Sequence, residues 1–173
     1  MKIKDILKSV LDFFKGKKII IEKNNIENIL PHRGRMLLLD KVIITRKKII
    51  GEFLVTDQVC EGHNVFNGKP IFKGSDLLDM AAQTLGVWIA QNSELGKEKM
   101  VVREYGKSKF RKPILPGEIL NSEILTEKIT IQKIENSGMI IIRGKKILIK
   151  VKEERRAEIS SVELVLFLLV NVF

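Results

Sequence analysis

The feature that most constrains the fold is a helix without a polar face, predicted over residues 76–91. Leucine, methionine, alanine, valine, tryptophan and isoleucine surround it on nearly every side, and a helix of this kind must be buried. The segments that read as strands lie on both sides of it, at 36–44, 49–56, about 100–111, 117–131, 137–152 and 156–170. This order predicts an α+β protein in which an antiparallel sheet wraps around one long central helix.

The chain is expected to form a single domain, residues 19–173, preceded by an amphipathic helix over residues 1–18. Apolar residues recur at helical spacing in that first segment: Ile3, Ile6, Leu7, Val10, Leu11 and Phe14. We expect this helix to pack on the body or on a second subunit, with a membrane surface as the alternative. Charged residues interrupt the same segment, so it does not resemble a secretion signal.

The single cysteine, Cys60, has no partner for an intramolecular disulfide, which fits a reducing, cytoplasmic location. No cluster of histidines and cysteines stands at metal-ligand spacing, so no metal site is expected. The formal net charge is +10, but the basic residues are scattered among acidic ones. Aromatic residues make up only 6% of the chain, so we do not expect a nucleic-acid-binding protein. An acidic partner on a local basic surface stays open.

The apolar helix contains a carboxylate, Asp79, and follows a loop that holds His63. Burying a carboxylate is costly, so such a group gains hydrogen bonds or a raised pKa, and it is then suited to proton transfer. A histidine titrates in the same range. The free amides at the start of the helix, near Gly74, can hold an oxyanion, and Ser75 is the expected N-cap. These groups suffice to remove a proton next to a thioester carbonyl, although each also has a purely structural interpretation.

Several blocks of the sequence occur in the order, and at nearly the spacings, of one enzyme family: "ILPHRGRMLLLDKV" (29–42), "GHNVFNGKPIFKG" (62–74), "LLDMAAQTLGVW" (77–88) and "KFRKPILPGEIL" (109–120). They resemble the 3-hydroxyacyl-[acyl carrier protein] dehydratases, the FabA/FabZ family of hotdog-fold enzymes. The resemblance extends over roughly residues 26–170. It implies dehydration of 3-hydroxyacyl thioesters to trans-2-enoyl thioesters in fatty acid or related lipid synthesis, without a cofactor.

The resemblance also implies roles for individual residues. The matching catalytic histidine is His63, the matching carboxylate of the central helix is Asp79, and Gly74 matches the glycine whose N–H binds the thioester oxygen. Gln83 matches the glutamine of the helix motif and is expected to orient the carboxylate. The family assembles each site from both subunits of a dimer, so a homodimer or higher homo-oligomer is expected. Pro31, His32 and Arg33 match an element that we interpret as structural.

The loop after His63 departs from the family pattern. It is longer than the family's tight loop, and Lys73 replaces a proline before Gly74. Two blocks are also similar to a divergent branch of hotdog dehydratases linked to aryl polyene synthesis, in which the histidine loop is rebuilt. Aspartate at position 79 is the residue of the FabA branch, which also isomerises its product. The other blocks resemble the FabZ branch, so dehydration without isomerisation is expected.

The remaining predictions concern substrate and partner. An acyl chain is expected to lie along the central helix, against Phe72, Leu78 and Trp88, although all of these residues are also plausible core. Acyl carrier protein is strongly acidic, and a basic segment is its expected docking face: Lys107, Lys109, Arg111 and Lys112. A lysine-protected strand edge is the alternative for that segment. The alternatives for the whole protein are a hotdog acyl thioesterase and a non-catalytic subunit that binds acyl thioesters.

Overall fold

The computed structural model describes residues 18–64, 68–91, 99–134 and 139–167. The predicted amphipathic helix of residues 1–18 falls almost wholly outside these ranges, so it stays a prediction. Within the described ranges, no helix is both long and apolar enough to cross a membrane.

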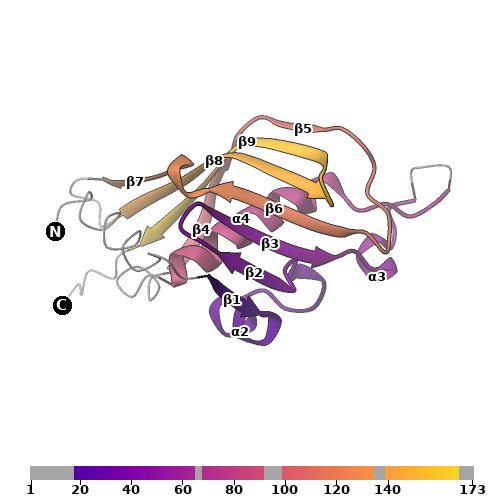
Figure 1. The fold of residues 1–173 in the computed structure, drawn as a ribbon, viewed down its shortest axis with the longest axis horizontal. Coiled ribbons are helices and arrows are strands. Elements are labelled where there is room, and N and C mark those ends of the chain that lie inside the picture. Colours follow the sequence, from indigo (N-terminus) through magenta and orange to yellow (C-terminus); the bar gives the residue numbers. More distant parts are fainter. Residues whose placement is uncertain (1–17, 65–67, 92–98, 135–138, 168–173) are drawn as a thin grey trace.

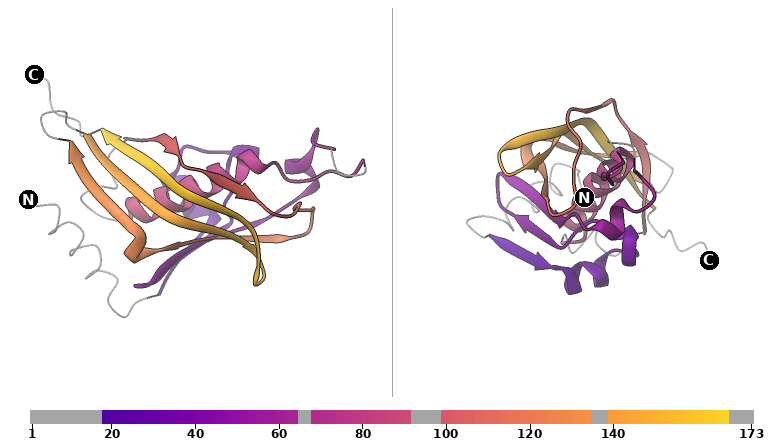
Figure 2. Two further views of the ribbon diagram at one scale, coloured as in Figure 1. Left: turned by 90° about the horizontal axis from the view of Figure 1, so that it is seen from above. Right: turned by 90° about the vertical axis from the view of Figure 1, so that its right-hand side faces the viewer.

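An antiparallel sheet wraps around one long helix, as the sequence predicts (Figure 1). Its main path runs β1-β2-β3-β6-β8-β9-β4, while β5 pairs with β9 and β7 pairs with β8. The strands are β1 Ile19–Glu22, β2 Lys41–Ile44, β3 Lys48–Leu54, β4 Lys99–Tyr105, β5 Ser108–Phe110, β6 Ile119–Leu125, β7 Ile129–Ile134, β8 Met139–Val151 and β9 Glu154–Phe167. Figure 2 shows the sheet curling around the helix, so that β4 comes to lie on the other side of it from β2 and β3. This is the hotdog arrangement.

The central helix, α4, extends over Gly74–Ala90. Every residue from 80 to 89 is buried, which confirms that the apolar helix forms the middle of the core. Gly51 on β3 allows the sheet to approach it closely, because a Cβ atom at Gly51 would lie 2.3 Å from Thr84 Oγ1. The helix begins earlier than expected, with Lys73 at the N-cap position. Ser75 lies inside the first turn, where its hydroxyl donates to Asp76 Oδ1. The prediction of Ser75 as N-cap is therefore wrong.

The first apolar segment, 36–44, is only partly a strand. β2 begins at Lys41, a short 3-10 helix spans Gly34–Met36, and the buried Leu37, Leu38 and Leu39 between them are not in the sheet. The Leu38 N–H and the Met36 carbonyl bond to a side chain of α4 instead of to a neighbouring strand. The short helix α2, Lys23–Ile29, ends just before Pro31, because the residue before a proline disfavours the helical conformation. The strand β1 was not predicted.

The second half of the chain is built of strands, as expected, with two interruptions. The predicted strand 100–111 divides into β4 and β5 because Gly106 packs against β9, where a Cβ atom would lie 2.3 Å from Ser160 Oγ. The predicted strand 117–131 divides at a 3-10 turn, Thr126–Lys128, into β6 and β7. The other helix, α3, is a single turn at Asp57–Cys60, in the segment predicted as loop.

Candidate active site

His63 lies at the base of the loop that follows α3. Its N–H donates to Cys60 O (3.1 Å), its carbonyl accepts from Ile71 N (3.1 Å), and its ring Nδ1 is 3.0 Å from Ile71 O. Main chain and ring are thus both fixed to Ile71. The additional residues of this loop lie between the two anchor points, and residues 65–67 lie outside the described ranges. The lengthened loop therefore leaves the histidine anchored.

The partner of Nδ1 determines the tautomer of His63. A carbonyl oxygen accepts but cannot donate, so the 3.0 Å contact requires the proton on Nδ1. In the neutral ring, Nε2 then carries the free lone pair and can accept a proton. His63 is half-buried, so this nitrogen belongs to a side chain that is ordered and still accessible.

Gly74 begins α4 beside His63. The first N–H groups of a helix have no partner within the helix, so the Gly74 amide lies at its positive end. The ring of Phe110 covers this position, 3.3 Å from where a Cβ atom would stand. The backbone of Lys73, at φ −71°, has the torsion that a proline requires, which explains why the lost proline does not disturb the entry into the helix.

His63 and Gly74 line one cavity of about 390 Å³, together with Phe72, Phe110 and Arg111 among others. Asp79 lines a different and larger cavity of about 790 Å³, bordered by Gln83, His32 and apolar residues of α2, α4, β4 and β9. The two cavities share no lining residue. Within one chain, His63 and Asp79 therefore face separate spaces.

Asp79 has a partner that the sequence did not reveal. The hydroxyl of Tyr105, at the end of β4, donates to Asp79 Oδ1 at 2.5 Å. Burial, and then the hydrogen bond to Asp79 and its charge, raise the pKa of Tyr105 well above its usual 10, so this hydroxyl stays a donor. Tyr105 is the only tyrosine of the chain, and that was the one signal available; nothing in the sequence links it to Asp79.

His32 lies on the same cavity as Asp79. Burial lowers the pKa of His32, the charge of Asp79 opposes this, and Arg33 lowers the pKa further. The neighbouring Arg33 donates to the carbonyls of Leu30 and His32, both at 2.6 Å. These bonds fix the chain just after α2, which fits the structural interpretation of Pro31, His32 and Arg33.

Gln83 is buried and holds the segment before β2. Its Oε1 accepts from Leu38 N (2.9 Å), and its Nε2 donates to Met36 O (2.7 Å). The amide thus takes the place of a neighbouring strand for backbone that the sheet does not reach. These contacts give Gln83 a part in holding the wall beside Asp79; its expected role in orienting the carboxylate stays a prediction.

Replacing Gln83 by leucine is expected to lower the free energy of unfolding by about 2–4 kcal/mol, because two backbone groups lose their partner. Urea unfolding at a fixed protein concentration measures this. Thr84→Val is the matched control on the same helix. It removes a hydroxyl that donates to Met80 O (2.8 Å) and is expected to cost less than about 1 kcal/mol, since that carbonyl remains in the helix ladder. Equal losses of unfolding free energy in the two variants would contradict the role of Gln83 in holding the backbone before β2.

The residues predicted to contact an acyl chain do not line a common cavity in the structure. Phe72 lines the His63 cavity, while Leu78 is half-buried and packs against the core. Trp88 is 1% exposed, lies in the core and borders neither of the two cavities. The apolar wall of the Asp79 cavity comes from Ala82, Gly86 and Leu164 among others.

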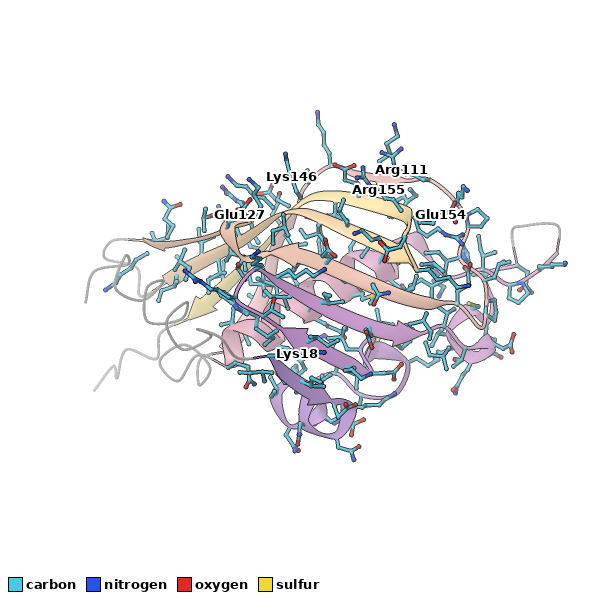
Figure 3. All side chains as sticks on the ribbon, viewed as in Figure 1. Lys18, Arg111, Glu127, Lys146, Glu154 and Arg155 are labelled. Carbon is cyan, nitrogen blue, oxygen red and sulfur yellow. The ribbon has the colours of Figure 1, made fainter. Side chains whose placement is uncertain are left out.

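The predicted docking residues all lie exposed along β5 and its flanks. Arg111 is 3.5 Å from Glu158, and Lys112 pairs with Glu154. In the described part of the chain, Lys107 and Lys109 have no such ion pair. Figure 3 shows Arg111 and Arg155 at the same outer edge of the molecule. Since Arg111 and Lys112 also line the His63 cavity, positive charge borders its opening.

Among the described residues, no three histidine, cysteine, aspartate or glutamate side chains gather as metal ligands do. The groups of the site that can take part in a reaction are a histidine whose Nε2 is not occupied by Ile71, an aspartate with a tyrosine donor, and the amide at a helix start. They can transfer protons and stabilise a negative oxygen.

A family model described as "FabA-like domain" matches residues 30–154. The chain is 38% identical over 107 residues to a "Bifunctional enzyme LpxC/FabZ" of Chlorobaculum tepidum, a match that covers 59% of this chain and 22% of that enzyme. It is 33% identical over 125 residues to a "3-hydroxyacyl-[acyl-carrier-protein] dehydratase FabZ" of Clostridium acetobutylicum, which covers 70% of this chain and 87% of the relative.

A solved structure has the same fold. The dehydratase heterocomplex ApeI:P from Xenorhabdus doucetiae aligns with a TM-score of 0.57 at 17% identity, over 80% of this chain and 88% of the other. The chain spans about a fifth of the bifunctional relative, so that similarity concerns one part of a longer enzyme.

Proposed function

This chain belongs to the FabA-like domain family, and on that premise we propose that it dehydrates 3-hydroxyacyl thioesters carried by acyl carrier protein to trans-2-enoyl thioesters. The hydrogen bond between His63 Nδ1 and Ile71 O carries the proposal, because it occupies Nδ1 and leaves Nε2 as the ring nitrogen that can act as a base in the cavity. The buried, free Cys60 fits the reducing cytoplasm in which we propose the reaction takes place.

In the proposed mechanism, His63 Nε2 removes the proton from the carbon next to the thioester carbonyl. The Gly74 N–H, at the positive end of α4, binds the carbonyl oxygen and stabilises the negative charge that develops there. The bond from the neighbouring carbon to its hydroxyl then breaks as a carbon–carbon double bond forms. For this step Asp79 must carry a proton: its carboxyl group donates that proton to the hydroxyl, which leaves as water. The proton that His63 removed then returns to Asp79 through solvent, so that one water is lost in total.

This mechanism needs His63 and Asp79 in one site, and we propose that a second copy of the chain brings them together. The edge strand β4 supports this: Val101 is 49% and Val102 42% exposed, and both line the Asp79 cavity. An apolar strand at a sheet edge is suited to pair with another strand. In a homodimer of this kind, the histidine cavity of one subunit would meet the carboxylate cavity of its partner.

We further propose that acyl carrier protein docks on the basic segment Lys107, Lys109, Arg111 and Lys112. A thioester on a flexible arm must enter next to His63, and Arg111 and Lys112 border that cavity. Because two of these cations have carboxylate neighbours in the chain, Lys107 and Lys109 have the charges most available to an acidic partner.

Reversing both charges, with Lys107→Glu and Lys109→Glu, is expected to raise KM for an acyl carrier protein substrate about tenfold at low salt, because attraction becomes repulsion. The effect should shrink in high salt. KM for a small crotonyl thioester should not change. Lys47→Glu, at the turn between β2 and β3, is the control for a charge reversal elsewhere. Equal KM changes for the carrier-bound and the small substrate would contradict docking.

A single set of assays tests the activity itself. With a 3-hydroxyacyl thioester, a dehydratase forms the enoyl product, which absorbs in the ultraviolet. A saturated acyl thioester is not changed by a dehydratase but releases free thiol with a thioesterase. Binding of both substrates without turnover would identify a non-catalytic subunit. Either of the last two results would overturn the proposed function.

A further inference from the structure

The end of β4 brings a tyrosine against the carboxylate of the central helix. Tyr105 pairs with Val162 of β9, and the next residue, Gly106, donates to Ser161 O at 2.8 Å. Gly106 also packs so closely that a Cβ atom there would lie 2.4 Å from Ser161 Oγ. Tyr105 therefore stands at a point where the backbone is fixed to the sheet, and such a point can position a side chain closely.

The backbone of Asp79 is also fixed, because this residue lies in the second turn of α4, a helix that is buried in the core. The distance of 2.5 Å from Tyr105 Oη to Asp79 Oδ1 is that of a strong O–H···O hydrogen bond to a carboxylate. Because the helix and the strand are both held, the bond fixes the rotation of the carboxylate as well as its location.

We propose that Tyr105 is a positioning residue for the dehydration: its hydroxyl holds Oδ1 of Asp79 so that Oδ2 is presented to the hydroxyl group of the substrate. The proposal rests on the proposed function. Aspartate is one methylene shorter than glutamate and reaches less far into the cavity. The hydrogen bond from Tyr105 to Oδ1 keeps this short side chain in one orientation. Less conformational freedom of the carboxyl group then has to be lost in reaching the transition state.

The raised pKa of Tyr105 agrees with this role. A hydroxyl that does not ionise in the working range keeps donating to Asp79, so the carboxylate keeps its orientation from neutral to alkaline pH. Tyr105 itself is not the acid of the reaction, because it borders the carboxylate rather than the cavity that Asp79 lines.

The first test is Tyr105→Phe, which removes the hydroxyl and keeps the ring. We expect kcat for the 3-hydroxyacyl thioester to fall about 10- to 100-fold while KM changes less than about threefold, because a misaligned group costs rate rather than binding. Ser108→Ala is the matched control. It removes a neighbouring hydroxyl that donates to Gly106 O (3.1 Å) and does not touch Asp79, and it should keep kcat within about twofold. An unchanged kcat in Tyr105→Phe, or equal losses in both variants, would overturn the proposal.

The second test does not depend on activity. Because the chain has one tyrosine, a ¹³C label at Tyr Cζ gives one NMR signal, which moves when the phenol ionises. In Asp79→Asn, the transition should begin at lower pH than in the unchanged protein, since the negative charge beside the phenol is gone. If the Cζ signal begins to move at the same pH in both proteins, the contact between Tyr105 and Asp79 would be refuted. A protein that keeps the contact but turns over no thioester would refute the proposed function instead, and with it the reaction in which Tyr105 takes part.

Discussion

Replacing His63 by alanine is expected to lower kcat for hydration of a crotonyl thioester, the reverse reaction, about 10³-fold, because the site loses its general base. Asp79→Asn should cause a loss of similar size, since an amide keeps the shape of the carboxyl group but transfers no proton. Both variants should remain folded, as measured by circular dichroism and by the urea midpoint, because both side chains lie outside the fully buried core.

The hydrogen bond to Ile71 allows a sharper version of this experiment. In His63→Asn, the amide nitrogen can take the place of Nδ1 and donate to Ile71 O, so the loop anchor is kept while Nε2 is lost. This variant should be as inactive as His63→Ala. Recovery of activity in His63→Asn would mean that His63 serves only to anchor the loop, and the assignment of the base would fall.

Mixing the two inactive proteins is expected to restore activity. If each site takes His63 from one subunit and Asp79 from the other, a mixed dimer of His63→Ala and Asp79→Asn contains one intact site and one doubly damaged site. Random pairing makes half of the dimers mixed, so the mixture should recover about a quarter of the full activity. Each variant taken alone through the same subunit-exchange procedure should recover no activity.

Differently tagged subunits, refolded together and purified through both tags, give the mixed dimer alone, and its kcat per dimer should be about half that of the unchanged protein. Inactive mixed dimers would contradict a site shared in this way. They would point to a site that takes His63 and Asp79 from the same chain. Chemical cross-linking with and without substrate measures the dimer fraction on which the calculation depends.

The sequence predicted most of the fold because burial follows local patterns. The all-round apolar helix could only be central, and the long apolar segments after it became β8 and β9. The errors occur where a contact from a distant residue decided the local structure. The segment 36–39 is apolar like a strand, but Gln83 binds the Leu38 N–H and the Met36 carbonyl, and the sheet begins only at Lys41.

For the candidate site, the sequence by itself determined which groups are present: a histidine at a loop base, a carboxylate in an apolar helix and a glycine at the helix start. Only the tertiary structure decided how they are arranged. His63 and Asp79 line separate cavities of one chain, Trp88 lies in the core, and Tyr105 reaches Asp79 across the space between β4 and α4. The physical reason is range: periodicity records which side of an element is buried, whereas the partner of a buried side chain depends on strand pairing and on how the sheet curls, which bring together residues far apart in the sequence.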